Sequence, residues 1–453
     1  MSGGDDTEPL DTLSVAERAV ALAEAAGASE AEALVSAEQA QLTRFANSEI
    51  HQNVAETNGS LNLRVAIGNR VGVASSNRLD EDGLRRLAET ATAIARNSAE
   101  LEDWGGLPEP TPIREVAAGW SEGTAAATPE QRADGVRAVI AAADAAGIRA
   151  FGSFSTSAEH LAVANSHGIR AAQRRTSAQL LTVTMAADGG SGYAEQAAVD
   201  VSAIDAASVG REAADKARAS TNPVAVEPGD WTVVLEEYAV VDLLSMLAYM
   251  GFSALAVQEE RSFAEPGKVI GSELVTIVDD AEEPGAFPMA FDYEGVAKQK
   301  VVLVERGVCR DVVYDAQTGA RGGHPSTGHG LPAPNTYGPF PLNMVMSAGT
   351  TERGALVGEM ERGLLVTRFH YTNPVHPKLA IVTGMTRDGT FLVEGGKVVG
   401  PVRNLRFTQS YLAALAGTVA VGRERRTVRG DFGGVLVPAV RIEGWTFTGA
   451  TEH

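Results

Sequence analysis

The apolar positions of the first hundred residues switch from helical to strand spacing and back. Small apolar residues recur every three or four positions after Ser14, which predicts a helix that Ser14 caps and Gly27 ends. Alternating stretches with a turn at Gly68-Asn69 predict strands, and a second helix is expected from about Asp80 to Arg96. These strands are expected at residues 32–35, 41–45, 60–67 and 70–75.

The segment 128–220 repeats the plan of the segment 12–98. Residues 143–147 echo the Ala-rich helix end at 23–27, and Val163-Ala164-Asn165-Ser166 echoes Phe45-Ala46-Asn47-Ser48 at nearly the same distance downstream. We interpret this as two copies of one α-β-β-β-α plan, joined by a Gly- and Pro-rich connector. Chance similarity in an Ala-rich chain is the alternative.

The second half of the chain has mostly strand spacing after one opening helix. A short apolar strand at 231–235 leads into apolar residues at helical spacing from Tyr238 to Met250, which predicts a buried helix with Gly251 at its end. Short helices are expected at 351–362 and 410–417. Further strands are expected at 269–278, 301–304, 308–314, 364–369, 379–383, 390–393, 398–407 and 434–444.

These patterns together predict an α+β fold. We expect a duplicated N-terminal α/β domain over 12–220, with repeats at 12–98 and 128–220. A β-rich, antiparallel barrel or sandwich is expected over 230–450.

Charge and cysteine content narrow the classes of function. The 453 residues include 58 acidic and 38 basic side chains, and the net charge of −20 argues against general affinity for nucleic acid or anionic lipid. The single Cys309 excludes an internal disulfide and suits a reducing compartment. The start of the sequence has no signal-peptide pattern, so a cytoplasmic location is expected. An apolar window at 238–257 contains Asp242 and has acidic flanks, which favours a buried helix over a membrane span.

Several separate blocks resemble the TldD/PmbA (TldE) family of metallopeptidase proteins. The resemblance covers nearly the whole chain and implies a cytosolic two-subunit enzyme that cuts small or unfolded peptides. Its blocks are Arg44-Phe45-Ala46-Asn47-Ser48, Pro325-Ser326-Thr327-Gly328-His329, and the segments 363–367, 383–389 and 402–407.

For the catalytic branch, the resemblance implies a helix bearing His-Glu-x-x-x-His and a cysteine near the C-terminus. Two imidazoles and a thiolate hold zinc, and the glutamate takes a proton from its water. Here the matching positions hold Ser245, Met246, Met250 and Asp431. Because a hydroxyl and a thioether are poor zinc ligands, the chain is more similar to the TldE (PmbA) branch. We expect no catalytic residue and no metal in this chain, and zinc in a TldD-like partner subunit.

Other roles remain open at this point. His324, His329, His370 and His376 could converge into a non-standard site of a metal-dependent hydrolase, or be ordinary loop histidines. A non-proteolytic peptide-binding or structural protein that forms a self-dimer is the third possibility. A peptide cleft is expected where a long Gly- and Pro-rich loop meets the end of the strand at 364–369. Its expected substrate-binding residues are Ser326, Thr327, His329, Arg368, His370, Tyr371 and Asn373.

Overall fold

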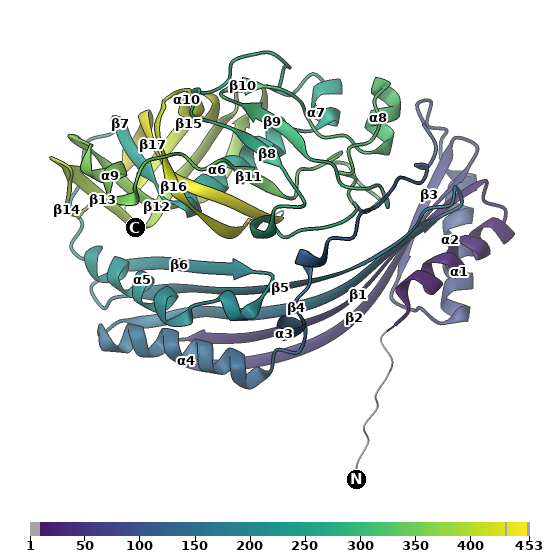
Figure 1. The fold of residues 1–453 in the computed structure, drawn as a ribbon, viewed down its shortest axis with the longest axis horizontal. Coiled ribbons are helices and arrows are strands. Elements are labelled where there is room, and N and C mark those ends of the chain that lie inside the picture. The colour runs from purple at the N-terminus through teal and green to yellow at the C-terminus, as the bar shows by residue number, and fades with distance from the viewer. Residues whose placement is uncertain (1–9, 431–432, 451–453) are drawn as a thin grey trace, which may run out of the picture.

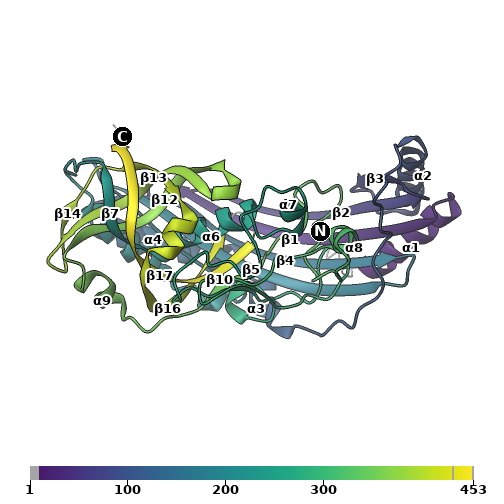
Figure 2. The same cartoon turned by 90° about the horizontal axis from the view of Figure 1, so that it is seen from above.

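A computed structural model of the chain describes residues 10–430 and 433–450. The N-terminal half forms a long curved sheet, and the C-terminal half lies over one face of it, as Figure 1 shows from the side and Figure 2 from above. The predicted α+β class with mostly antiparallel sheets is confirmed. In the two described ranges, no helix is long and apolar enough to cross a membrane.

The N-terminal half consists of two copies of one plan, as predicted. The first copy comprises α1 (Thr12–Ala25), β1 (Glu30–Ala46), β2 (Glu49–Ile67), β3 (Arg70–Ser76) and α2 (Glu81–Asn97). The second comprises α4 (Pro129–Ala145), β4 (Arg149–Asn165), β5 (Arg170–Met185), β6 (Ser191–Ala198) and α5 (Ala206–Ala219), preceded by the short α3 (Glu122–Ala125). The strand order β3-β2-β1-β4-β5-β6 places the copies back to back through β1 and β4.

The repeated Asn-Ser dipeptides have matching structural roles. Ser48 Oγ accepts a hydrogen bond from Ala150 N at 3.2 Å, and Ser166 Oγ accepts one from Ala31 N at 3.0 Å. Each serine therefore ties the turn of its own copy to the first strand of the other copy. This reciprocal contact gives a physical reason for the echo in the sequence.

Two N-terminal details differ from the prediction. Asp11, and not Ser14, caps α1, because its carboxylate accepts the amide hydrogen of Ser14. The strands expected at 32–35 and 41–45 are one strand, β1, whose polar central residues face the C-terminal half or solvent.

The C-terminal half contains one large sheet that folds back on itself around a buried helix. Its strands are β7 (Gly229–Leu235), β8 (Ile277–Asp279), β9 (Val301–Glu305), β10 (Val308–Cys309), β11 (Met344–Met346), β12 (Arg362–His376), β13 (Ile381–Glu394), β14 (Lys397–Pro401), β15 (Leu405–Ser410), β16 (Thr418–Gly430) and β17 (Gly433–Ala450). Its helices are α6 (Glu237–Met250), α7 (Ala254–Gln258), α8 (Ala316–Gly322), α9 (Arg353–Gly358) and α10 (Tyr411–Ala416). Of the two expected architectures, the sheet is sandwich-like and not a closed barrel. The long β17 pairs with β15, β16 and β7.

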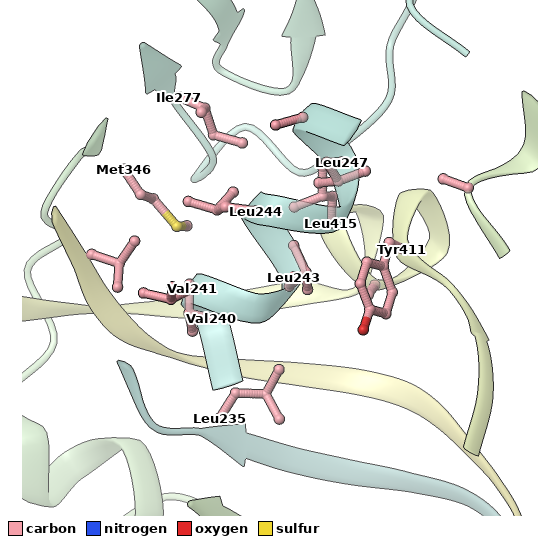
Figure 3. Close-up of a cluster of buried hydrophobic side chains, with 14 of the residues drawn as sticks. Leu235, Val240, Val241, Leu243, Leu244, Leu247, Ile277, Met346, Tyr411 and Leu415 are labelled. Carbon is pink, nitrogen blue, oxygen red and sulfur yellow. The ribbon is translucent and has the colours of Figure 1, made fainter. Parts of the chain in front are cut away.

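Helix α6 occupies the centre of this half. Leu243, Leu244 and Leu247 point into a cluster that Ile277, Met346 and Leu415 complete (Figure 3). A helix that is apolar on nearly every face is stable only when other elements surround it. The prediction that 238–250 is a core helix and not a membrane span is therefore supported by its packing.

Several predicted C-terminal boundaries are wrong. The helix expected at 351–362 ends at Gly358, because the Met360 and Glu361 carbonyls accept hydrogen bonds from the turn between β13 and β14. The strand expected at 269–278 is confined to β8. The strand expected at 379–383 begins only at Ile381, because Leu379 and Ala380 belong to a short turn, and it continues through 390–393 as one strand, β13. Asp388 and Gly389 within β13 have φ of 54° and 120°. Strand β16 was not predicted at all.

Buried charges join the two halves where α5 meets α6. Lys216 Nζ lies 2.8 Å from Glu212 Oε1 and 2.6 Å from Glu236 Oε2. Arg426 of β16 lies 3.0 Å from Glu212 Oε2 and also contacts the hydroxyl of Tyr238. These contacts connect the N-terminal half to the first turn of the central helix.

Candidate functional site

One face of α6 lines a small polar pocket, which we call the motif pocket. Its volume is about 170 Å³. Helix α6, β6 of the N-terminal half, and β12 and β16 of the C-terminal half supply its walls. The lining residues are Tyr193, Glu195, Tyr238, Val241, Asp242, Ser245, Met246, Arg368, Phe369, Val428, Arg429 and Gly430.

The positions singled out in the sequence do not all reach this pocket. Ser245 and Met246 line it, whereas Met250 is 1% exposed and packs in the core. At 3.6 residues per turn, a spacing of five residues rotates a side chain by about 140° around a regular helix. Asp431 lies outside the described residues.

Asp242 is the acidic group of α6 in the motif pocket, and both of its oxygens accept hydrogen bonds. Tyr411 donates its hydroxyl to Asp242 Oδ1 at 3.0 Å, and Thr372 donates to Oδ2 at 2.6 Å. The carboxylate therefore fixes α6 against β12 and α10.

The opposite wall of the motif pocket contains Arg368 and Tyr193. Arg368 donates from Nε to Asp388 Oδ2 at 2.6 Å, and its guanidinium lies 4.5 Å from the centre of the Tyr193 ring. Tyr193 donates its hydroxyl to Glu195 Oε2 at 2.6 Å. Burial and then the Glu195 charge raise the pKa of Tyr193 well above its ordinary value, so this hydroxyl remains a donor.

The residues of the motif pocket do not fit a zinc ion. Ser245 offers a hydroxyl and Met246 a thioether, which are poor ligands for zinc. The Arg368 guanidinium lines the same pocket and disfavours a divalent cation. Within residues 10–430 and 433–450, no group of three or more His, Cys, Asp or Glu side chains could hold a metal ion.

The loop residues predicted to bind substrate form an internal network instead. His329 is 1% exposed, with Nε2 at 2.8 Å from Asp279 Oδ1 and Nδ1 at 2.9 Å from Thr327 Oγ1. Ser326 donates its hydroxyl to the Tyr314 carbonyl at 3.2 Å. These contacts hold the loop in place, and both ring nitrogens of His329 are engaged within the protein.

Charges inside this network explain its pKa shifts. Burial and then the Lys298 ammonium lower the pKa of His329. Burial alone would raise the pKa of Asp279, but Lys298 at 3.0 Å and His329 outweigh it and lower that pKa. The network therefore contains a neutral imidazole beside a buried Lys–Asp ion pair.

The remaining predicted residues lie on the outer part of β12. His370 packs edge-on against Tyr371, with 4.6 Å between ring centres, and Asn373 donates to the Tyr371 carbonyl at 2.9 Å. Tyr371 is 73% exposed, and β12 shifts register at this bulge. Among the predicted substrate-binding residues, Arg368 is the one that lines the motif pocket.

The structure does not bring the four histidines of the alternative metal site together. His324 stacks on Tyr314 with 5.0 Å between ring centres, while His329 is bonded to Asp279 in the interior. His370 and His376 lie on β12. The hypothesis of a metal site built from these histidines has no geometric support among the described residues.

Sequence reasoning missed the residues that β6 and β16 contribute to the motif pocket. Glu195 Oε1 accepts the amide hydrogen of Arg429 at 3.0 Å, which links these two strands. The run of charges from Arg423 to Arg426 hid the strand pattern of β16. The apolar residues of 419–421, together with Gly430 at the end of the segment, were the available signal.

Comparison with known proteins gives a consistent assignment. The model of the PmbA/TldA metallopeptidase C-terminal domain matches residues 228–449, that of domain 1 matches 31–95, and that of the central domain matches 123–221. The fold is similar to the crystal structure of TldE from Thermococcus kodakarensis, with a TM-score of 0.88, 22% identity, and coverage of 96% of this chain and 100% of that one.

Two curated relatives align over shorter stretches. An uncharacterized protein of Methanocaldococcus jannaschii is 36% identical over 129 residues, which are 28% of this chain and 31% of the relative. A metalloprotease TldD homolog of Buchnera aphidicola is 25% identical over 201 residues, 40% of each protein. These alignments span less than half of either relative. Since three domain models of one family match successive parts of the sequence, the chain belongs to the PmbA/TldD family of metallopeptidase proteins.

Proposed function

We propose that this chain is the non-catalytic subunit of a two-subunit zinc metallopeptidase that acts on small or unfolded peptides. A TldD-like mate carries the zinc, and this chain contributes interface and part of the peptide cleft. The proposal is supported chiefly by the chemistry of the motif pocket. Where the catalytic branch needs imidazoles and a free carboxylate, the described residues supply a hydroxyl, a thioether and the Arg368 guanidinium. The Asp242 and Glu195 carboxylates of the pocket already accept hydrogen bonds from this chain.

Within this proposal, Arg368 is the substrate-contacting residue. Its guanidinium lies in the motif pocket, and Asp388 and the Tyr193 ring fix its position. A guanidinium held in this way suits a peptide carbonyl or carboxylate. Ser326, Thr327 and His329 hold the loop in place and do not contact the substrate, because their polar side-chain groups form hydrogen bonds within this chain.

An exposed apolar surface on the hairpin between β12 and β13 is the proposed contact with the mate. Tyr371, Val375 and Leu379 are 73%, 58% and 52% exposed. Exposed apolar side chains that gather on one element are typical of protein–protein contacts.

The test uses the purified chain, a TldD-like subunit that carries His-Glu-x-x-x-His, and the two together. We expect no stoichiometric zinc and no peptide cleavage from this chain alone, co-purification with the mate, and cleavage by the pair. Val375→Glu should abolish co-purification, because it places a charge in the proposed contact. Val269→Glu is the matched control, since Val269 is 70% exposed on a different segment.

A mate whose motif glutamate is replaced by Gln should bind this chain but leave the pair inactive. Stoichiometric zinc together with cleavage by the isolated chain would contradict the proposal. Failure to bind any such mate, combined with a stable self-dimer, would favour a role outside proteolysis.

A further inference from the structure

A second cavity lies between the N-terminal sheet and the C-terminal half, and we call it the sheet cavity. Its volume is about 280 Å³. The floor comes from β1, β4 and β5, and the roof includes residues 287–289, Leu342, Asn343 and Gly430. The charged and amide side chains that line it are Glu38, Glu159, Arg175, Asn343 and Arg429.

Strand register places the floor residues side by side. Glu38 of β1 pairs with Glu159 of β4, which in turn pairs with Arg175 of β5. Directly paired residues on adjacent strands project from the same face of a sheet. That face is covered by the C-terminal half, because Arg175 also contacts Tyr293 and Met289.

Part of the polar floor is satisfied internally. Arg175 forms an ion pair with Glu159, and Glu159 also accepts a hydrogen bond from Ser36 at 2.8 Å. The Ser157 and Ser177 hydroxyls are 2.9 Å apart and bond to each other. The Arg175–Glu159 pair and the two serine hydroxyls thus carry no net charge together, although Arg175 Nε is buried without a partner.

Two oppositely charged side chains have no direct ion pair among the described residues, although the Arg429 charge acts on Glu38. Across the described ranges, Glu38 has neither a hydrogen bond nor an ion pair, although it is only partly exposed. Burial and then the Glu159 charge raise the pKa of Glu38 above its ordinary value. The Arg429 guanidinium donates to the Ser177 hydroxyl at 2.9 Å and has no carboxylate partner within the same ranges.

Asn343 adds a third unsatisfied group. It is 2% exposed, and its amide nitrogen donates to the carbonyls of Ala286 and Phe287 at 2.9 and 2.8 Å. Its Oδ1 atom is buried without a partner. A buried acceptor left unpaired costs free energy, which a ligand N–H would offset.

We propose that the sheet cavity binds a short zwitterionic peptide, with its free amino end at Glu38 and Asn343 and its free carboxylate at Arg429. Two acceptors and one cationic donor facing one cavity match the two ends of such a ligand. The volume lies near the lower limit of about 300 Å³ for small-molecule sites, which suits a dipeptide better than a long chain. The ligand class is thus that of peptidase products.

This inference rests on the proposed function and deepens it, because short peptides are what a peptidase complex releases. It concerns this chain alone, so its test needs no mate. If the chain does not bind a dipeptide, the proposed pairing with a mate is not contradicted. If the chain does not pair with a mate, dipeptide binding in the sheet cavity is not contradicted.

The experiment is calorimetric titration of the full chain with the dipeptide Ala-Ala, acetyl-Ala-Ala and Ala-Ala-amide. We expect saturable one-site binding of Ala-Ala and affinity about tenfold or more lower for each blocked form, since each loses a charge-assisted contact. The Glu38→Gln variant should bind Ala-Ala more weakly than the unmodified chain does. Its affinities for Ala-Ala and acetyl-Ala-Ala should be equal. The affinities of the Arg429→Gln variant for Ala-Ala and Ala-Ala-amide should likewise be equal.

Exposed residues outside the cavity provide the controls. Glu56→Gln on β2 and Arg406→Gln on β15 should bind all three ligands like the unmodified chain. Unchanged melting temperatures would show that the cavity variants remain folded. The proposal is overturned if Ala-Ala does not bind saturably, or if each cavity variant weakens all three ligands equally.

Discussion

Ser245 and Met250 lie on the same helix but in different surroundings. Ser245 lines the motif pocket, while Met250 is enclosed by the core around α6. At the scale of single residues, the role of each position is therefore set by the face of the helix from which its side chain projects.

Truncating these two side chains should change the free energy of unfolding by very different amounts. Met250→Ala should lower the free energy of unfolding by about 2–5 kcal/mol, because it leaves a cavity in a packed core. Ser245→Ala should change it by less than about 1 kcal/mol. Urea denaturation of the two variants checks this, and equal losses for both would show that Met250 is not a core residue.

At the scale of elements, α6 is anchored at its start by charges from the N-terminal half. Tyr238 accepts a hydrogen bond from Glu195 N at 3.0 Å and lies 3.2 Å from Glu212 Oε1. Arg426 of β16 completes this contact. One tyrosine hydroxyl thus joins β6, α5 and α6, three elements that the sequence separates.

Removing that hydroxyl should loosen the contact between the halves. Tyr238→Phe leaves buried polar partners unsatisfied, so we expect a loss of about 1–3 kcal/mol in unfolding free energy. Proteolysis in the joint at 221–228 should also become faster. Tyr371→Phe is the control, because its ring is 73% exposed. Equal behaviour of the two variants would argue against an anchoring role for Tyr238.

At the scale of the whole molecule, a second junction lies near the opposite end of the sheet. Arg64 of β2 is 2.7 Å from Glu32 Oε2 of β1 and 3.0 Å from Glu294 Oε1 of the C-terminal half. The Arg64 guanidinium thus forms ion pairs with two buried carboxylates, Glu32 and Glu294. Burial, opposed by Arg64 and reinforced by Glu294, raises the pKa of Glu32 to about 7.

This shift predicts a pH dependence of stability. Between the ordinary pKa of 4.5 and about 7, the folded chain holds more protons at Glu32 than the unfolded chain. Its contribution is therefore complete below pH 4.5 and is lost as pH rises through 7. Urea midpoints of the unmodified chain should fall across this range, and Glu32→Gln should flatten the fall. Glu56→Gln, on an exposed part of β2, should leave the fall unchanged. If Glu32→Gln also leaves the dependence of the urea midpoint on pH unchanged, Glu32 is not the group responsible.

Local patterns in the sequence determined the order of elements, the duplicated N-terminal plan and the identity of residues at the motif positions. They could do so because these signals depend only on residues close together in the sequence. The signals are the helix and strand periods, the turn residues, and the echo at Asn47 and Asn165. The α6 helix and the duplication were accordingly predictable. Strand β16 was not, because its charged residues face solvent and the N-terminal half.

Only the tertiary structure decided which side chains share a site. Glu38 and Arg429 line one cavity, and Arg368 stacks on Tyr193, through strand register and the packing of one half on the other. His329 resembled a ligand in sequence but is occupied by Asp279, a contact between distant segments. The physical reason is that pockets form where surfaces of remote elements face each other, and local periodicity carries no information about that pairing.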